Sequence, residues 1–171
     1  LGHAVPVKHL SVVCAVVALS LSLAGCRQAD GPLPSMEGSV PNELGDLGRD
    51  LQNLASGQAD GAKDLADDLA HYADNGAQGD PKARELARLL GEALAGKSFK
   101  MPQALEVAQT SWLTVSARQL SEKQITDLQN EMKTRLVALG VAEQTAAKVA
   151  EQVGVVQQEV TQRHRRWYER S

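Results

Sequence analysis

Most of this chain carries apolar residues at spacings of three and four, as one buried face of an α-helix requires. Leucines and valines recur in this way from Asn42 to Trp167, and no segment there indicates a strand. Trp112 and Met132 lie within these stripes, and we interpret both as core residues. Because only 3% of the residues are aromatic, the core must consist mainly of leucine, valine and alanine. We predict an all-α fold, a helical bundle of about five helices with short connections.

Local capping and stop signals predict the boundaries of the helices. A first helix should start at Asn42, a good N-cap residue, with a break or a frayed turn at Gly57 and Gly61. The turn residues at 75–79 should end it. Asp80 is followed by proline, and this pair predicts a strong helix start, because proline suits the first helical position after a capping side chain.

The second half of the chain carries signals for a helical hairpin. Ser121 and Gln124 have the spacing of a capping box, in which each side chain satisfies the backbone N–H of the other residue. Gly140, followed by Val141, predicts a Schellman-type stop, because glycine readily adopts the left-handed conformation that this turn needs. A further helix is expected to begin at Pro102, before the hairpin.

The last helix has a narrow apolar seam that follows a heptad pattern, as in a coiled coil. Its members are Ala142, Ala146, Val149, Val153, Val156, Val160, Arg163 and Trp167. We predict that the seam packs against the helix at 125–139, so that the two helices form a C-terminal antiparallel hairpin. A charge at Val156 should then severely weaken the fold. A charge at Gln157 or Gln158 should cost far less, provided that both are exposed.

The other strongly apolar part of the chain is the run from Leu10 to Leu23, which Lys8 precedes. As a helix, this run would rise roughly 21 Å, short of the roughly 30 Å hydrocarbon core of a membrane. A basic flank, a short apolar run and small residues at its end are typical of a secretory signal peptide. The alternative is a buried core helix, but the run has no N-cap and no amphipathic period.

The run ends in Leu23-Ala24-Gly25-Cys26, which resembles the lipobox of bacterial lipoprotein signal peptides. The resemblance implies cleavage before Cys26, a diacylglycerol on its thiol and, usually, acylation of the new amino group. Two or more acyl chains anchor a protein stably to a membrane. We therefore expect a lipoprotein signal peptide at 1–25, the lipidated cysteine with a flexible linker at 26–42, and a helical domain at 43–171.

This resemblance also bears on location and on cysteine chemistry. Arg27 follows the cysteine where lipoproteins of the inner membrane often carry aspartate, which favours the periplasmic face of the outer membrane if the host is Gram-negative. The other cysteine, Cys14, lies in the segment that would be removed, so no disulfide or thiolate metal site is expected. The linker after Cys26 should span roughly 20 to 24 Å.

The segment LSEKQ, from Leu120 to Gln124, is followed by an amphipathic helix, a glycine turn and a long polar helix. This arrangement resembles the helical hairpins of Spy- and CpxP-type periplasmic chaperones and stress sensors. The resemblance covers only the hairpin and one copy of their L-T-x-x-Q motif, with Ser121 in place of threonine. It implies a dimeric helical cradle that binds unfolded clients or metals in the envelope.

Five aspartates and one histidine form an acidic stripe on the helix expected before residue 75. Its members are Asp60, Asp64, Asp67, Asp68, His71 and Asp74, which fall within one arc opposite the leucines. Asp64, Asp68 and His71 have the spacing i, i+4 and i+7 that would let them bind one divalent cation. The alternative, which we favour, is a solvated acidic face that promotes solubility and loose cation association. We therefore expect no specific metal site and no cofactor.

The segment RHRRWYER, from Arg163 to Arg170, has the opposite charge. One interpretation is that its cations complement the negative end of the helix dipole. The other is that they bind the phosphates of anionic lipids, with Trp167 and Tyr168 at the membrane interface. Nucleic acid is not an expected partner, because the chain would be exported and is mildly acidic, with a net charge of −3.

No catalytic pattern is evident in the chain. The histidines after Cys26 are His71 and His164, and there is no HExxH helix and no glycine-rich phosphate loop after a strand. We expect a lipid-anchored, non-enzymatic helical interaction protein of the bacterial cell envelope, with a protein partner or self-association through its helices. The alternative is a stress- or metal-responsive sensor or a chaperone of the Spy and CpxP type.

Overall fold

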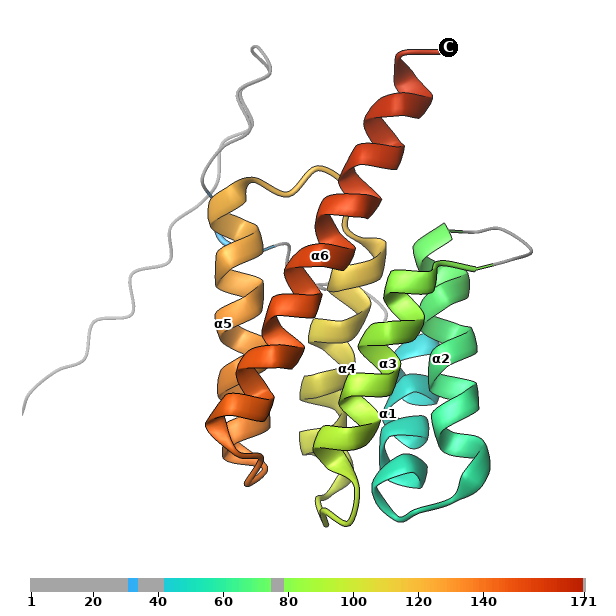
Figure 1. Ribbon diagram of the computed structural model, residues 1–171, viewed down its shortest axis with the longest axis vertical. Coiled ribbons are helices and arrows are strands. Elements are labelled where there is room, and N and C mark those ends of the chain that lie inside the picture. Colours follow the sequence, from blue (N-terminus) through green and yellow to red (C-terminus); the bar gives the residue numbers. More distant parts are fainter. Residues whose placement is uncertain (1–30, 34–41, 75–78, 171) are drawn as a thin grey trace, which may run out of the picture.

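The computed structural model describes residues 31–33, 42–74 and 79–170, and this part of the chain is an all-α bundle of six helices without strands (Figure 1). The helices are α1 (Asn42–Ala55), α2 (Ala59–Asp74), α3 (Pro81–Leu94), α4 (Met101–Ser116), α5 (Glu122–Ala138) and α6 (Glu143–Tyr168). The predicted fold class is therefore confirmed. The first predicted helix is in fact two helices, α1 and α2, so the bundle has six helices where about five were expected.

The helices run alternately in opposite directions through the bundle, and short segments connect them (Figure 1). α3 and α4 lie in the middle. The α1–α2 pair packs against them on one side, and the α5–α6 hairpin packs against them on the other. One end of the bundle therefore carries the starts of α1, α3 and α5 together with the ends of α2, α4 and α6.

Two glycines near the connection between α1 and α2 have different roles. Gly57 has a φ of +78°, a left-handed conformation that glycine adopts without strain, and it lies in the turn that follows α1. Gly61 lies inside α2, where an added Cβ atom would be 2.6 Å from the backbone nitrogen of Leu54. The expected break is therefore at Gly57, whereas Gly61 allows two helices to approach closely.

The capping box and the Schellman stop predicted for the hairpin are both confirmed. The Ser121 hydroxyl accepts a hydrogen bond from the Gln124 backbone N–H at 3.2 Å, and the Gln124 side chain accepts one from the Ser121 N–H at 3.0 Å. At the other end of α5, Gly140 has a φ of +78°. Its N–H and that of Val141 donate to carbonyls in the last turn of α5, the two bonds of a Schellman motif.

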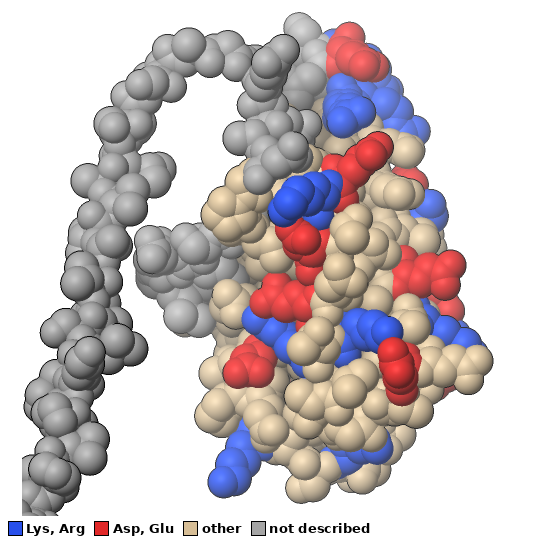
Figure 2. Space-filling view, turned by 90° about the vertical axis from the view of Figure 1, so that its left-hand side faces the viewer, with Lys and Arg blue, Asp and Glu red and all other residues tan. Residues whose placement is uncertain are grey.

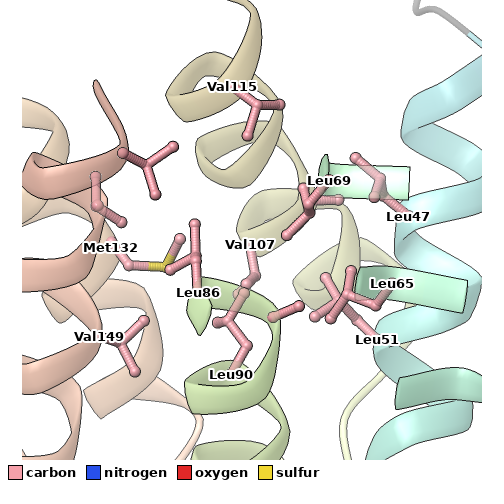
Figure 3. Close-up of a cluster of buried hydrophobic side chains, with 14 of the residues drawn as sticks. Leu47, Leu51, Leu65, Leu69, Leu86, Leu90, Val107, Val115, Met132 and Val149 are labelled. Atoms are coloured by element: carbon pink, nitrogen blue, oxygen red, sulfur yellow. The ribbon is translucent and has the colours of Figure 1, made fainter. Parts of the chain in front are cut away.

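The buried leucines, valines and alanines form one core that extends from α1 and α2 to α6 (Figure 3). Met132 is completely buried, and Trp112 packs against the core with its ring edge-to-face with that of Tyr72. The valines of the α6 seam are all buried, namely Val149, Val153, Val156 and Val160. Because α6 packs against α5 across the short Gly140 turn, the predicted antiparallel hairpin is confirmed.

The assumption that Gln157 is exposed is wrong. Gln158 is exposed, but Gln157 is completely buried, and its amide nitrogen donates to the carbonyls of Thr114 and Ala117 at 3.2 and 2.6 Å. The reason is that α6 packs against α3 and α4 as well as α5, so its buried face is wider than a coiled-coil seam. A charge at Gln157 should therefore be costly.

The segments before α1 are described only in part. The predicted signal peptide, residues 1–25, and Cys26 lie outside the described residues, whereas residues 31–33 of the predicted linker lie within them. Among the helices that the structure describes, none is both long and apolar enough to cross a membrane.

Candidate functional site

Two charged regions of the bundle are candidates for function, one between α1 and α2 and the other at the end of α6. The first, which we call the acidic groove, has a volume of about 320 Å³. It is lined by Asp46, Arg49, Asp50, Asn53, Asp64, Asp67 and Asp68. The groove forms because two amphipathic helices pack side by side, with their leucines buried and their acidic faces adjacent.

Burial and like charges make the acidic groove costly to ionise. Burial, followed by the negative charges of Asp68, Asp64 and Asp46, raises the pKa of Asp50 to about 6. Burial and the neighbouring aspartates also raise the pKa of Asp68. The groove therefore takes up protons at a higher pH than separate aspartates would.

The residues considered as a cation site are not arranged as one. Within the described part of the chain, no three histidine, cysteine, aspartate or glutamate side chains are placed to hold a metal ion. Asp64 and Asp68 line the acidic groove, whereas His71 makes an edge contact with a neighbouring tyrosine ring. Asp67 pairs with Arg84 at 2.6 Å, and this hydrogen bond lowers the pKa of the carboxyl. The stripe is thus divided between the groove, an ion pair and a ring contact.

Sequence reasoning found only the α2 side of the groove. Asp46 and Asp50 come from α1, where the spacing i, i+4 places them on one face, but this local signal does not show which helix they meet. Of the remaining members of the stripe, Asp60 is exposed at the start of α2, and the side chain of Asp74 lies outside the described residues. The long-range pairing of α1 with α2 completes the groove.

The second charged region begins where α6 is held against the rest of the bundle. Arg163 forms an ion pair with Asp80, whose completely buried carboxylate also accepts bonds of 2.7 and 3.1 Å from two backbone N–H groups in the first turn of α3. The Nδ1 atom of His164 lies 3.2 Å from the side-chain nitrogen of Gln119, in the connection between α4 and α5. These contacts fix α6 at the end of the bundle.

Beyond these contacts, α6 continues past the body of the bundle (Figure 1). Arg165, Arg166, Trp167 and Arg170, which we call the basic tip, are all exposed. The Trp167 side chain is 63% exposed, more than any other large apolar side chain that the structure describes. Figure 2 shows several basic side chains beside an acidic one at this end of the molecule, and charges of both signs over the body.

Three residues of the predicted linker lie against α5 near this end. The amide nitrogen of Gln124 donates to the carbonyls of Gly31 and Pro32 at 3.3 and 3.2 Å, and Leu33 packs against the core. Gln124 therefore serves two segments, since its oxygen completes the capping box of α5 and its nitrogen binds residues 31 and 32. The chain thus meets the bundle close to the start of α5.

The predicted lipid-attachment residue, Cys26, lies five residues before Gly31 and outside the described residues. Comparison of the chain with models of known protein families, with curated proteins and with solved structures gave no match in any of the three. Function therefore has to be inferred from the residues and their arrangement.

Proposed function

We propose that this chain is a lipid-anchored, non-enzymatic interaction protein of the bacterial cell envelope. The observation that carries the proposal is the sequence Leu23-Ala24-Gly25-Cys26 at the end of a short apolar run with a basic flank. In this proposal residues 1–25 are removed and Cys26 carries the lipid. The bundle then stands outside the cytoplasm, on the periplasmic face of the outer membrane in a Gram-negative host.

The surface of the bundle supports a binding role. The acidic groove and the basic tip carry opposite charges and lie on different helices. Charged regions of this kind steer partners during encounter and select among them by complementarity. The acidic groove would suit a basic segment of a partner protein, or the basic tip of a second copy of this chain.

Replacement of Cys26 tests the anchor. In a bacterial host supplied with labelled palmitate, the wild-type protein should incorporate label and sediment with membranes, and Cys26→Ala should do neither. The matched control is Cys14→Ala, which changes the other cysteine of the chain and should leave labelling intact. Lack of label in the wild type, or label retained in Cys26→Ala, would overturn the proposal.

A chaperone of the Spy and CpxP type is the alternative to an interaction protein. The resemblance implies a hairpin that offers a surface to unfolded clients, but the valine seam of α6 is buried within the bundle, where α6 packs against α3, α4 and α5. We therefore expect that the purified protein does not slow the aggregation of an unfolding client at equimolar ratio. Protection of the client would favour the chaperone.

A further inference from the structure

We propose that the basic tip of α6 is a second membrane contact, which binds the phosphates of anionic lipids beside the lipid anchor. This inference rests on the proposed function, because it takes Cys26 as the anchored residue. It adds to that proposal a class of ligand, anionic lipids, and the surface of the folded domain that would bind them. Arg165, Arg166 and Arg170 would bind lipid phosphates, and Trp167 would enter the interface.

The position of residues 31–33 limits the distance between the anchor and the basic tip. Five residue steps separate Cys26 from Gly31, and a fully extended chain covers about 18 Å in five steps. Gly31 is held by Gln124, in the first turn of α5. The far end of α5, at Ala138, lies about 21 Å from Gln124 along the helix axis. An anchor at Cys26 therefore cannot reach the level of Ala138, at the end of the bundle opposite the basic tip.

The length of α6 brings the basic tip beyond the rest of the bundle. The contact between His164 and Gln119 marks the level at which the connection of α4 to α5 passes α6. From His164 to Tyr168 the helix rises about 6 Å further, and Figure 1 shows this part of α6 projecting past the other helices. A membrane surface at this end of the bundle would meet the tip first.

The side chains of the basic tip suit an anionic lipid surface. Guanidinium groups bind phosphate oxygens in a bidentate manner, and an indole ring prefers the boundary between headgroups and acyl chains. Residues 163–170 include four arginines and one glutamate, a net charge of +3 with histidine neutral. The helix dipole accounts for cations in the last turn of α6, but not for the large exposed surface of Trp167 among them.

The test uses the full chain, expressed in a bacterial host and purified from its membranes. Trp112→Phe leaves Trp167 as the single tryptophan. The protein is reconstituted into vesicles of phosphatidylcholine alone, or of equal parts phosphatidylcholine and phosphatidylglycerol, with brominated acyl chains in both. We expect the emission of Trp167 to shift to the blue and to be quenched by bromine in the anionic vesicles, and much less in the neutral vesicles.

Replacement of the three arginines should remove this difference. The combined variant Arg165→Gln, Arg166→Gln and Arg170→Gln should show the same low quenching in both kinds of vesicle. A cation near an anionic surface changes partitioning about fivefold, so loss of three should lower the ratio of docked to undocked tips about 100-fold. Salt of about 1 M should also lower the quenching of Trp167 in anionic vesicles for the protein that carries only Trp112→Phe. This check requires no further variant.

The matched control removes three exposed cations from elsewhere in the bundle. Arg88→Gln, Lys100→Gln and Lys148→Gln change the net charge by the same amount on α3, at the start of α4 and in the first half of α6, away from both the acidic groove and the basic tip. Quenching of Trp167 in anionic vesicles should be unchanged in this control. A control that loses quenching to the same degree would show that net charge is responsible, and the proposed contact would be wrong.

The mass of the purified protein separates failure of the anchor from failure of the contact. Protein without acyl groups would overturn both proposals. Acylated protein whose Trp167 is quenched equally in neutral and anionic vesicles would overturn only the lipid contact. A blue shift that depends on the arginines but grows with protein density in neutral vesicles would also overturn the lipid contact. It would indicate that the basic tip binds the acidic groove of a second copy of the chain.

Discussion

Replacing Gln157 by leucine should destabilise the bundle, although the substitution removes a polar side chain from an apolar environment. Gln157 lies in α6, and its amide nitrogen donates to the carbonyls of Thr114 and Ala117 in the last turn and C-cap of α4. Carbonyls at the end of a helix have no intrahelical donor. The amide oxygen of Gln157 also accepts a hydrogen bond of 3.1 Å from the Thr161 hydroxyl. One side chain thus caps α4 from a neighbouring helix.

The magnitude follows from the groups that would lose their partner. Leucine is similar in volume to glutamine, so the substitution should leave no large cavity. Two carbonyls and one hydroxyl would lose their hydrogen bonds in a buried site, and each buried unsatisfied group costs about 1–3 kcal/mol. Partial relaxation and water entry reduce the sum, and we expect a loss of about 3 kcal/mol. That is a large share of the roughly 5–15 kcal/mol of a typical domain.

Urea unfolding followed by circular dichroism measures this loss. Gln158→Leu is the matched control, because Gln158 is the next residue of α6 and is exposed. It should change the free energy of unfolding by no more than about 0.5 kcal/mol. Equal stabilities for the two variants would refute the reasoning, since the α4 carbonyls would then not depend on Gln157.

Three further changes test the packing and the charges. Val156→Asp should unfold the domain or nearly so in circular dichroism melts, because it places a carboxylate in the completely buried α6 seam. Gly61→Ala should lower the melting temperature, because its Cβ would be 2.6 Å from the backbone nitrogen of Leu54, whereas Gly45→Ala, with no atom within 4 Å, should raise it slightly. The pKa of Asp50 rises from 3.8 to about 6 on folding, so its stabilising effect is complete below about pH 4 and is lost as the pH rises through about 6. Linkage limits this pH-dependent change in the free energy of unfolding to about 3 kcal/mol, and the partial exposure of Asp50 reduces it to about 1 kcal/mol. Melting temperatures should therefore be higher at pH 5 than at pH 8. Asp50→Asn should remove most of that difference.

Local signals in the sequence were sufficient for three of the helix boundaries. The capping box at Ser121, the stop at Gly140 and the start at Asp80 each depend on backbone groups within a few residues, so their geometry follows from the residues themselves. The exact role of Gly61 did not follow. The sequence shows the same residue type whether a glycine breaks a helix or allows two helices to touch. Only the packing distinguishes the two roles.

Contacts between distant segments account for the remaining differences. The seam of α6 was expected to face one partner, as in a coiled coil, but α6 packs against three helices. Its buried arc therefore includes Gln157 and Thr161 beside the valines. In the same way, the aspartates of α2 indicated only half of the acidic groove, because Asp46 and Asp50 enter it through the pairing of α1 with α2. Periodicity shows which residues of a helix share a face, but not how many helices cover that face.

The positions of the charged regions matter more for the proposed membrane contact than the net charge does. The chain carries a net charge of −3, which by itself would be repelled by an anionic surface. The acidic groove lies on the α1–α2 pair, and α3 and α4 separate it from the α5–α6 hairpin (Figure 1). Electrostatic attraction at about 0.15 M salt is confined to about 8 Å, so it acts on the groups nearest the surface. Because α6 projects past the bundle, those groups are the arginines of the basic tip, and the repulsion of the groove favours an orientation that keeps α1 and α2 away from the lipid.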